Sequence, residues 1–178
     1  MHIKKFIREW VVPIGVAIAI AFIIHTFIFF QIKVPSSSMY PTIKIGDRII
    51  VTRVYNRSNL KTGDIVVFYS HELELTLIKR LIGVPGDEVK INDSGEVFIN
   101  GKQLDQPYVI NKANISKNFK VPEGKYLFFG DNREVSNDAR WWKDPYIDGK
   151  DIEGKAQVII FPFKRLGKFV IGQEAINK

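Results

Sequence analysis

The sequence predicts a mostly β protein in which one N-terminal transmembrane helix is followed by a single antiparallel β domain. The first observation is the run from Trp10 to Phe30, which contains no Asp, Glu, Lys or Arg. The second is the change after Val34 to short β-like runs separated by turn residues. The third is that no convincing amphipathic helix follows, whereas a parallel sheet needs crossover helices. A chain of 178 residues suits one such domain and an anchor.

The apolar run predicts a retained membrane anchor. At about 1.5 Å per residue, a helix over residues 10–30 crosses the roughly 30 Å hydrocarbon core of a bilayer. The alternative is a cleaved signal peptide, whose apolar region is usually about 7–15 residues long and precedes a small-residue site. Here the run ends in the bulky sequence FIFFQIKV. We therefore expect the anchor to stay on the chain.

The residues before the run predict its orientation. Lys4, Lys5 and Arg8 outnumber the single acid Glu9, and a positive flank favours the cytoplasmic side of a membrane. We expect a single-pass protein of the cell membrane. Its three parts are a cytoplasmic tail (1–9), a transmembrane anchor (10–30) and an extracytoplasmic domain (31–178).

The expected strands are short runs rich in β-branched and aromatic residues. They are Arg48–Arg53, Asp64–Tyr69, Leu73–Ile82, Glu88–Ile91, Glu96–Ile99, Tyr126–Gly130 and Lys155–Phe161. Asn100-Gly101 lies between VFI and KQL and predicts a two-residue hairpin turn.

Composition excludes several kinds of site. The net charge of +7 would suit an anionic membrane or a nucleic acid, but the basic residues are scattered, so we expect no nucleic acid partner. The absence of cysteine excludes disulfides and thiolate chemistry. Of the three histidines, only His71 lies where a soluble site could use it. We therefore expect no metal and no cofactor, and a Ser-His-Asp site would have to recruit His71.

Two stretches could supply a nucleophile and its base. Residues 35–42 read PSSSMYPT, which is either a linker loop or a turn in which Pro41 holds the hydroxyl of Ser38 in place. In the run Leu75–Ile82, alternation puts Lys79 in a row of leucines. Burial there would lower the pKa of Lys79, as a neutral lysine base requires, although an edge lysine could also reach water. A Ser-Lys hydrolase is therefore possible.

Two further stretches are polar or turn-like. Gly83-Val84-Pro85-Gly86-Asp87 reads best as a structural turn. Residues 130–140 read GDNREVSNDAR, which is either a solvated loop or a buried polar cluster that orients a catalytic group.

Together these stretches resemble the bacterial type I signal peptidases, or leader peptidases, in order and over nearly the whole chain. The nucleophile motif is Ser38-Met39-Tyr40-Pro41-Thr42, and the next box is residues 46–51, GDRIIV. The lysine box matches from Lys79 to Asp87, and the last box matches from Gly130 to Arg140 except at Ala139. A single anchor without a large inserted subdomain resembles the compact Gram-positive form.

The resemblance implies the family's antiparallel β catalytic domain and assigns roles to individual side chains. It implies that Ser38 is the nucleophile, Lys79 the general base and Ser36 a side-chain donor to the oxyanion. It also implies that Ser136 hydrogen-bonds and orients the lysine. Four charged residues are implied as structural support for the last box: Asp131, Arg133, Asp138 and Arg140.

The implied substrates are signal peptides of exported preproteins, cut after small-x-small sites. The peptide would bind in extended form beside residues 32–35 and 77–79 by adding a strand. Residues implied to line its pockets are Ile32, Val34, Pro35, Met39, Ile43, Leu77 and Ile78. The active site would face the lipid bilayer, and apolar side chains expected to enter lipid are Phe27, Phe29, Phe30, Phe161 and Phe163.

The chain departs from the family pattern at two positions. Ala139 stands where serine is usual, and Ser37 stands where glycine or another small residue is common. Neither is the expected nucleophile, base or oxyanion donor. The alternatives are a catalytically impaired anchored homologue that acts as a binding module, a self-cleaving repressor-type Ser-Lys protein, and a plain anchored β domain. The apolar anchor argues against the second of these, and the four ordered boxes argue against the third. Oligomeric state and the identity of the preproteins are not readable from the sequence.

Overall fold

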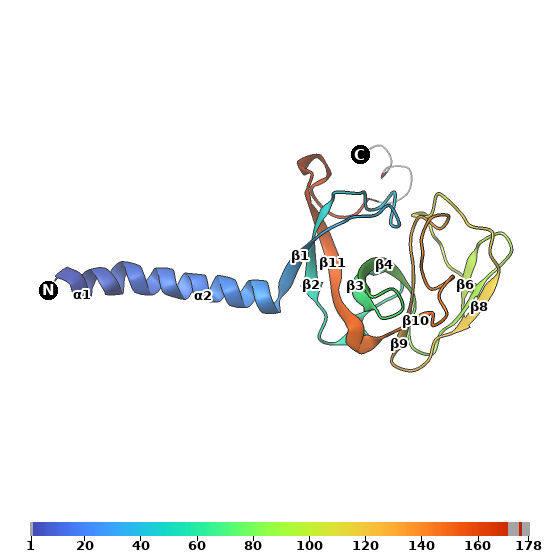
Figure 1. Ribbon diagram of the computed structural model, residues 1–178, viewed down its shortest axis with the longest axis horizontal. Helices are drawn as coiled ribbons and strands as arrows, with labels where there is room; N and C mark the ends of the chain where they lie inside the picture. Colours follow the sequence, from blue (N-terminus) through green and yellow to red (C-terminus); the bar gives the residue numbers. More distant parts are fainter. Residues whose placement is uncertain (1, 171–174, 176–178) are drawn as a thin grey trace.

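The computed structural model describes residues 2–170 and residue 175. Its N-terminal part is one long helix made of α1 (His2–Phe6), the π-helical segment η1 (Ile7–Val11) and α2 (Val12–Phe27). The stretch Ile3–Phe27 is long and apolar enough to cross a membrane, and none of the side chains of α2 is buried. Figure 1 shows the helix projecting away from the β domain, with the N-terminus at its far end.

The helix ends before the predicted anchor does. Helix α2 stops at Phe27, and strand β1 (Phe29–Lys33) begins after the single residue Ile28. Phe29 and Phe30 therefore belong to the sheet, although the predicted anchor extended to residue 30. Apolar composition does not distinguish a membrane helix from a strand, because phenylalanine is common in strands. Here Phe29 and Phe30 pair with β2. The membrane limits themselves stay a prediction.

The described residues form two sheets, and every strand pair in them is antiparallel. The seven-stranded sheet has the order β1, β2 (Arg48–Arg53), β11 (Ile152–Phe161), β3 (Ile65–Ser70), β4 (Leu75–Gly83), β9 (Lys125–Phe129) and β10 (Tyr146–Asp148). The four-stranded sheet has the order β7 (Lys102–Gln103), β6 (Val97–Ile99), β5 (Glu88–Ile91) and β8 (Lys117–Lys120). Short 3-10 turns are η2 (Arg57–Asn59), η3 (Gly149–Asp151) and η4 (Phe163–Arg165).

The predicted fold class, an antiparallel and mostly β domain behind one apolar helix, is confirmed. Each predicted run overlaps a strand, and the bounds of β2 and β5 agree with the prediction. Strand β4 begins two residues later than predicted, because the preceding turn includes Glu74 at a positive φ of 53°. Strands β1, β8 and β10 were not predicted: the first was hidden in the apolar run, and the other two are short and partly polar.

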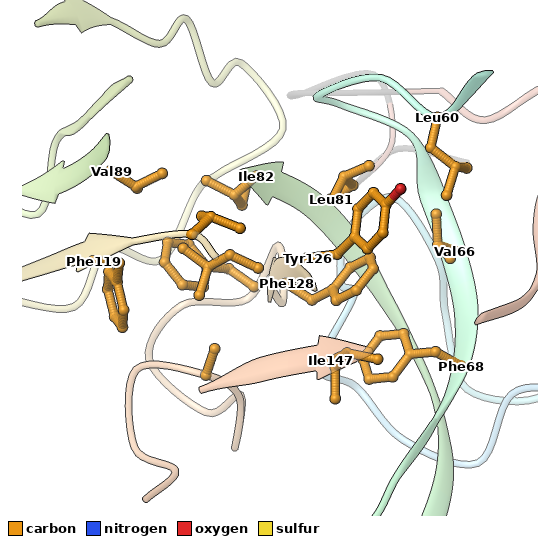
Figure 2. Close-up of a cluster of buried hydrophobic side chains, with 14 of the residues drawn as sticks. Leu60, Val66, Phe68, Leu81, Ile82, Val89, Phe119, Tyr126, Phe128 and Ile147 are labelled. Carbon is orange, nitrogen blue, oxygen red and sulfur yellow. The ribbon is translucent and has the colours of Figure 1, made fainter. Parts of the chain in front are cut away.

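Two clusters of buried apolar side chains hold the domain together. The first core, part of which Figure 2 shows, joins the two sheets; in it the rings of Phe68 and Phe128 stack with centroids 4.3 Å apart. The second core lies on the β1, β2 and β11 side and contains Val34, Met39, Ile43, Ile49, Val51, Ile65, Val67, Ile78, Ala156 and Ile159. Strand β4 contributes to both, with Leu81 and Ile82 in the first core and Ile78 in the second. The polar residues between these positions, Lys79 and Arg80, therefore lie where the two cores meet.

Candidate active site

The loop that carries Ser38 is fixed by its apolar neighbours. Met39 and Ile43 are completely buried in the second core, and burying each such side chain stabilises the fold by about 1.5–3 kcal/mol. The loop also closes on itself, since the amide of Tyr40 donates to the carbonyl of Ser37 at 3.0 Å. Ser38 is 8% exposed. A serine that could have been part of a mobile linker is thus held in one place.

Lys79 reaches this serine from strand β4. Its backbone pairs with Val66 of β3, its residue is 3% exposed, and Nζ donates a hydrogen bond to Oγ of Ser38. Burial lowers the pKa of Lys79 from its usual 10.5 to about 8. The carboxylate of Asp138 partly opposes this shift, and the guanidinium of Arg140 adds to it. The lysine therefore contacts the hydroxyl that the sequence predicts as the nucleophile.

The other two serines expected at the site occupy different positions. Oγ of Ser36 lies 3.3 Å from Oγ of Ser38 and is open to solvent. Ser136 is buried, but its Oγ has no hydrogen-bond partner. The hydrogen bond from Ser136 to Lys79 that the resemblance implies is therefore not formed in this structure. The hydroxyl points instead at the backbone of Gly130, where an added Cβ would collide with it and would lie 2.5 Å from the carbonyl oxygen of Ser38.

Asp131 connects the strand of the lysine to the loop of the serine. Its carboxylate accepts hydrogen bonds from Arg80 Nε at 2.7 Å, Arg80 Nη2 at 2.6 Å and Thr42 Oγ1 at 2.6 Å. Arg80 follows Lys79 directly, and its guanidinium lies 3.8 Å from the ring centre of Tyr108. All three partners of this cluster are nearly or fully buried. A charge pair this well bonded fixes the spacing of the two chain segments.

A second buried ion pair holds the loop of residues 130–140. Arg140 donates to both carboxylate oxygens of Asp138, at 2.8 and 2.9 Å, and Asp138 also accepts from the amide of Gly130 at 2.8 Å. Arg133 closes the loop by donating from Nε to the carbonyl of Gly130 at 2.9 Å. Ala139 is completely buried and belongs to the first core. The loop is thus a buried polar cluster rather than the solvated loop that the sequence left open.

Asn132 is a contact of the Ser38 loop that sequence reasoning missed. Its amide donates to the carbonyl of Ser38 at 3.0 Å, and its Nδ2 donates to the carbonyl of Ser37 at 3.2 Å. Its Oδ1 accepts from Asn111 Nδ2 at 3.0 Å. Asn132, Arg80 and Thr42 all occupy fixed positions of the boxes, so a signal for them was present in the sequence. Asn111 and Tyr108 lie outside every box, and no sequence signal points to them.

The residues expected to line the substrate pockets divide into two groups. Val34, Met39, Ile43 and Ile78 are buried in the second core, whereas Ile32 and Leu77 are half-buried and Pro35 is exposed. Two strand edges lie beside the second group. Among the described strands, β1 is at the end of its sheet, and β9 pairs with β4 only from Arg80 onward. The edge of β4 from Leu75 to Lys79 is therefore unpaired on the side facing away from β3.

His71, the histidine that a Ser-His-Asp site would have to recruit, has partners other than Ser38 and Lys79. Its Nε2 lies 3.1 Å from a carboxylate oxygen of Asp151, and its ring packs edge-on against Tyr69. Within residues 2–170 and 175, no three His, Cys, Asp or Glu side chains gather in a way that could hold a metal ion.

Comparisons with known proteins identify the family of the chain. The family model described as "Signal peptidase, peptidase S26" matches residues 7–161. A signal peptidase I from Enterococcus faecalis V583, of known crystal structure, is 30% identical, with a TM-score of 0.46 over 55% of this chain and 96% of that chain. Signal peptidase IB of Staphylococcus aureus (strain COL) is 38% identical, covering 90% of this chain and 92% of the relative. Signal peptidase I of Bacillus licheniformis is 36% identical, covering 93% and 94%. On the family match and these two relatives, the chain belongs to the signal peptidase family, peptidase S26.

Proposed function

We propose that this protein is a membrane-anchored serine endopeptidase that removes N-terminal signal peptides from exported preproteins through a Ser38-Lys79 dyad. The observation that carries the proposal is the hydrogen bond between Lys79 Nζ and Ser38 Oγ in a buried site. Membership of the signal peptidase family supports the substrate class.

In the proposed reaction, neutral Lys79 takes the proton of Ser38 as Oγ attacks the carbonyl of the scissile peptide bond. The amide of Ser38 and the hydroxyl of Ser36 would donate to the developing oxyanion, and one such donor typically contributes about 10²–10³ in rate. The lysine then protonates the leaving amine, and an acyl-enzyme forms on Ser38. Lys79, neutral again, activates the water that hydrolyses this ester. Ser136 stays our candidate for orienting Lys79, because its buried hydroxyl has no competing partner.

The proposed substrate geometry is an extended peptide lying along free strand edges. The unpaired edge of β4 from Leu75 to Lys79 offers backbone groups to such a peptide next to the dyad. Ile32, Pro35 and Leu77 are the accessible members of the expected pocket lining. The other expected lining residues, Val34, Met39, Ile43 and Ile78, are buried. Shallow pockets over such residues would suit small side chains at the first and third positions before the scissile bond.

The proposed topology follows from the helix and its flank. One helix of the described chain can cross a membrane, and Lys4, Lys5 and Arg8 precede its apolar part. A cytoplasmic N-terminus and an extracytoplasmic catalytic domain would place the dyad where signal peptides emerge.

The test is cleavage of a preprotein with an Ala-x-Ala site by the full chain in lipid, with EDTA throughout. We expect the wild type to cut after the second alanine and the Ser38→Ala variant to be inactive. Cleavage that survives in Ser38→Ala would rule out this nucleophile. If a folded wild type cuts none of several such substrates, the binding-module alternative takes first place.

The lowered pKa of Lys79 predicts a rising pH profile. The protonated amine cannot accept the proton of Ser38, so only the neutral fraction is active. With a pKa of about 8, kcat/KM should fall about tenfold per pH unit below pH 7 and level off above about pH 9. Initial rates measured between pH 6 and 10 on one peptide check this. A profile that is flat across this range would contradict a lysine base with this pKa.

A further inference from the structure

The end of the membrane helix is bonded to the catalytic domain through three consecutive carbonyls. Arg53 Nε donates to the carbonyl of Thr26 at 2.7 Å, and the hydroxyl of Tyr55 donates to the carbonyl of Phe27 at 2.7 Å. The amide of Arg53 donates to the carbonyl of Ile28 at 2.9 Å. The last carbonyls of a helix have no partner within the helix. Here the donors come from the end of strand β2 and the residues just after it.

Strand pairing directly after the helix also fixes the same junction. Strand β1 pairs with β2 from Phe29↔Thr52 onward, so only Ile28 separates the helix from the sheet. The guanidinium of Arg53 lies 4.9 Å from the ring centre of Phe30, which is half-buried against the second core. Gly154 leaves room for this ring, since a Cβ there would lie 3.2 Å from it. Phe30 is thus a packing residue and Phe29 is half-buried, whereas Phe27, Phe161 and Phe163 are the exposed members of the set expected to enter lipid.

The chemistry of the two donors suits the level of the membrane surface. Unpaired carbonyls are costly near hydrocarbon, where water is scarce. The C-terminal end of a helix carries partial negative charge, so the cation of Arg53 is favourable there. Tyrosine and arginine both combine an apolar body with a polar tip, and both are suited to the interface between lipid and water. Arg53 and Tyr55 can therefore satisfy the carbonyls at the helix end at a depth where water is too scarce to do so.

We propose that Arg53 and Tyr55, the junction pair, set the tilt and height of the catalytic domain above the bilayer and so position Ser38 against membrane-held preproteins. The inference rests on the proposed function. Ser38 lies ten residues beyond Ile28, within at most about 35 Å of the helix end. A junction free to bend would let the dyad move over that range, whereas a signal peptide held in the membrane presents its cleavage site at one height. The junction pair are positioning residues and touch no reacting atom.

The test compares two substrates of the full chain in vesicles of phosphatidylethanolamine and phosphatidylglycerol. One is a soluble peptide with an Ala-x-Ala site, and the other is a preprotein whose signal peptide is inserted in the same vesicles. The Arg53→Ala/Tyr55→Phe double variant should cut the peptide within about twofold of wild type. It should cut the preprotein at least about tenfold more slowly, because small misplacements of reacting groups have large effects on rate. The controls are Lys90→Ala, on β5 of the small sheet, and Tyr146→Phe, on β10 at the opposite edge of the large sheet from β1; they change a lysine and a hydroxyl away from the junction.

A direct measurement of height accompanies the rates. The chain has no cysteine, so Ser94→Cys, in an exposed turn of the small sheet, gives a unique site for a fluorescent donor. Energy transfer to acceptor lipids should give one efficiency in the wild type and a shifted or broader distribution in the double variant. Unchanged transfer overturns the proposal, and so does a preprotein rate that stays within about twofold of wild type or falls only in step with the peptide rate. If the wild type cuts neither substrate, the proposed function fails, and the energy transfer still decides the role of the junction pair.

Discussion

Replacing Lys79 with methionine is expected to abolish cleavage and, at neutral pH, to make the folded protein more stable. Methionine keeps the length and apolar stem of the side chain and removes the amine. Without a base to accept the proton of Ser38, kcat should fall by about 10⁴-fold or more, as when one member of a catalytic unit is removed. The peptide assay at pH 8.5 measures this loss.

The gain in stability follows from the buried ammonium. The pKa of Lys79 falls from 10.5 to about 8 on folding, which corresponds to a cost of about 3 kcal/mol for burying the charged form. The lost hydrogen bond to Ser38 offsets about 1 kcal/mol of this. We therefore expect the free energy of unfolding of Lys79→Met to exceed that of the wild type by about 1–3 kcal/mol at pH 7.

The pH dependence of this difference has a definite sign. Between about pH 8 and 10.5 the unfolded wild type binds a proton that the folded protein does not, so wild-type stability rises over this window. The advantage of Lys79→Met should be full below pH 8 and should disappear above pH 10.5. Denaturant titrations at pH 7 and pH 11 measure it, with the exposed Lys90→Met as control. A variant less stable than wild type at pH 7 would show that burial of this amine carries no such cost.

Removal of the carboxylate of Asp131 should unfold or nearly unfold the protein. Asp131→Ala leaves the guanidinium of Arg80 buried without its partner and frees the hydroxyl of Thr42. Breaking a buried ion pair from one side typically costs about 3–5 kcal/mol, which is a large share of the stability of an ordinary domain. Cleavage should be lost as well, because Asp131 joins the strand of Lys79 to the loop of Ser38.

Two further variants separate these effects. Asp131→Ala/Arg80→Met removes both charges, so it should regain part of the stability while staying inactive, since the two segments are no longer bonded. Asp93→Ala, in an exposed turn, is the matched loss of a carboxylate and should behave as wild type. Denaturant titration and the peptide assay on the same preparations are the measurements. An Asp131→Ala protein as stable and active as Asp93→Ala would contradict the role of Asp131 at the site.

The elements that could be predicted are those whose residues carry a strong local pattern. RIIVTR and EVKI became β2 and β5 with the predicted bounds, because β-branched residues alternate there between two faces. Phe29 and Phe30 could not be assigned locally, because their place in β1 depends on pairing with β2, a contact between distant parts of the chain. The same holds for β8 and β10, whose short sequences become strands only beside β5 and β9.

The site divides in a similar way. Alternation in β4 singled out Lys79, and the structure buries it; but both faces of this part of the strand are covered, so Arg80 is buried too. Alternation treated Arg80 as a residue of the opposite face and did not predict its bonds to Asp131. The contact between Ser38 and Lys79 joins residues 41 positions apart; scarce histidine and the isolated lysine made it possible, and the order of the boxes pointed to it more strongly. The hydroxyl of Ser136 has no hydrogen-bond partner in this structure, so its orienting role stays a prediction from the resemblance.

The position of Ser38 and Lys79 between two cores has a consequence for when the proposed peptidase activity can begin. The serine loop depends on Met39 and Ile43 of the second core, and the loop after β9 depends on Phe129 and Ala139 of the first. A chain in which only one core has formed has only part of the proposed catalytic site in place. Under the proposed function, cleavage therefore requires that both cores have formed around β4. A newly made chain would then be inactive until its own loops are folded.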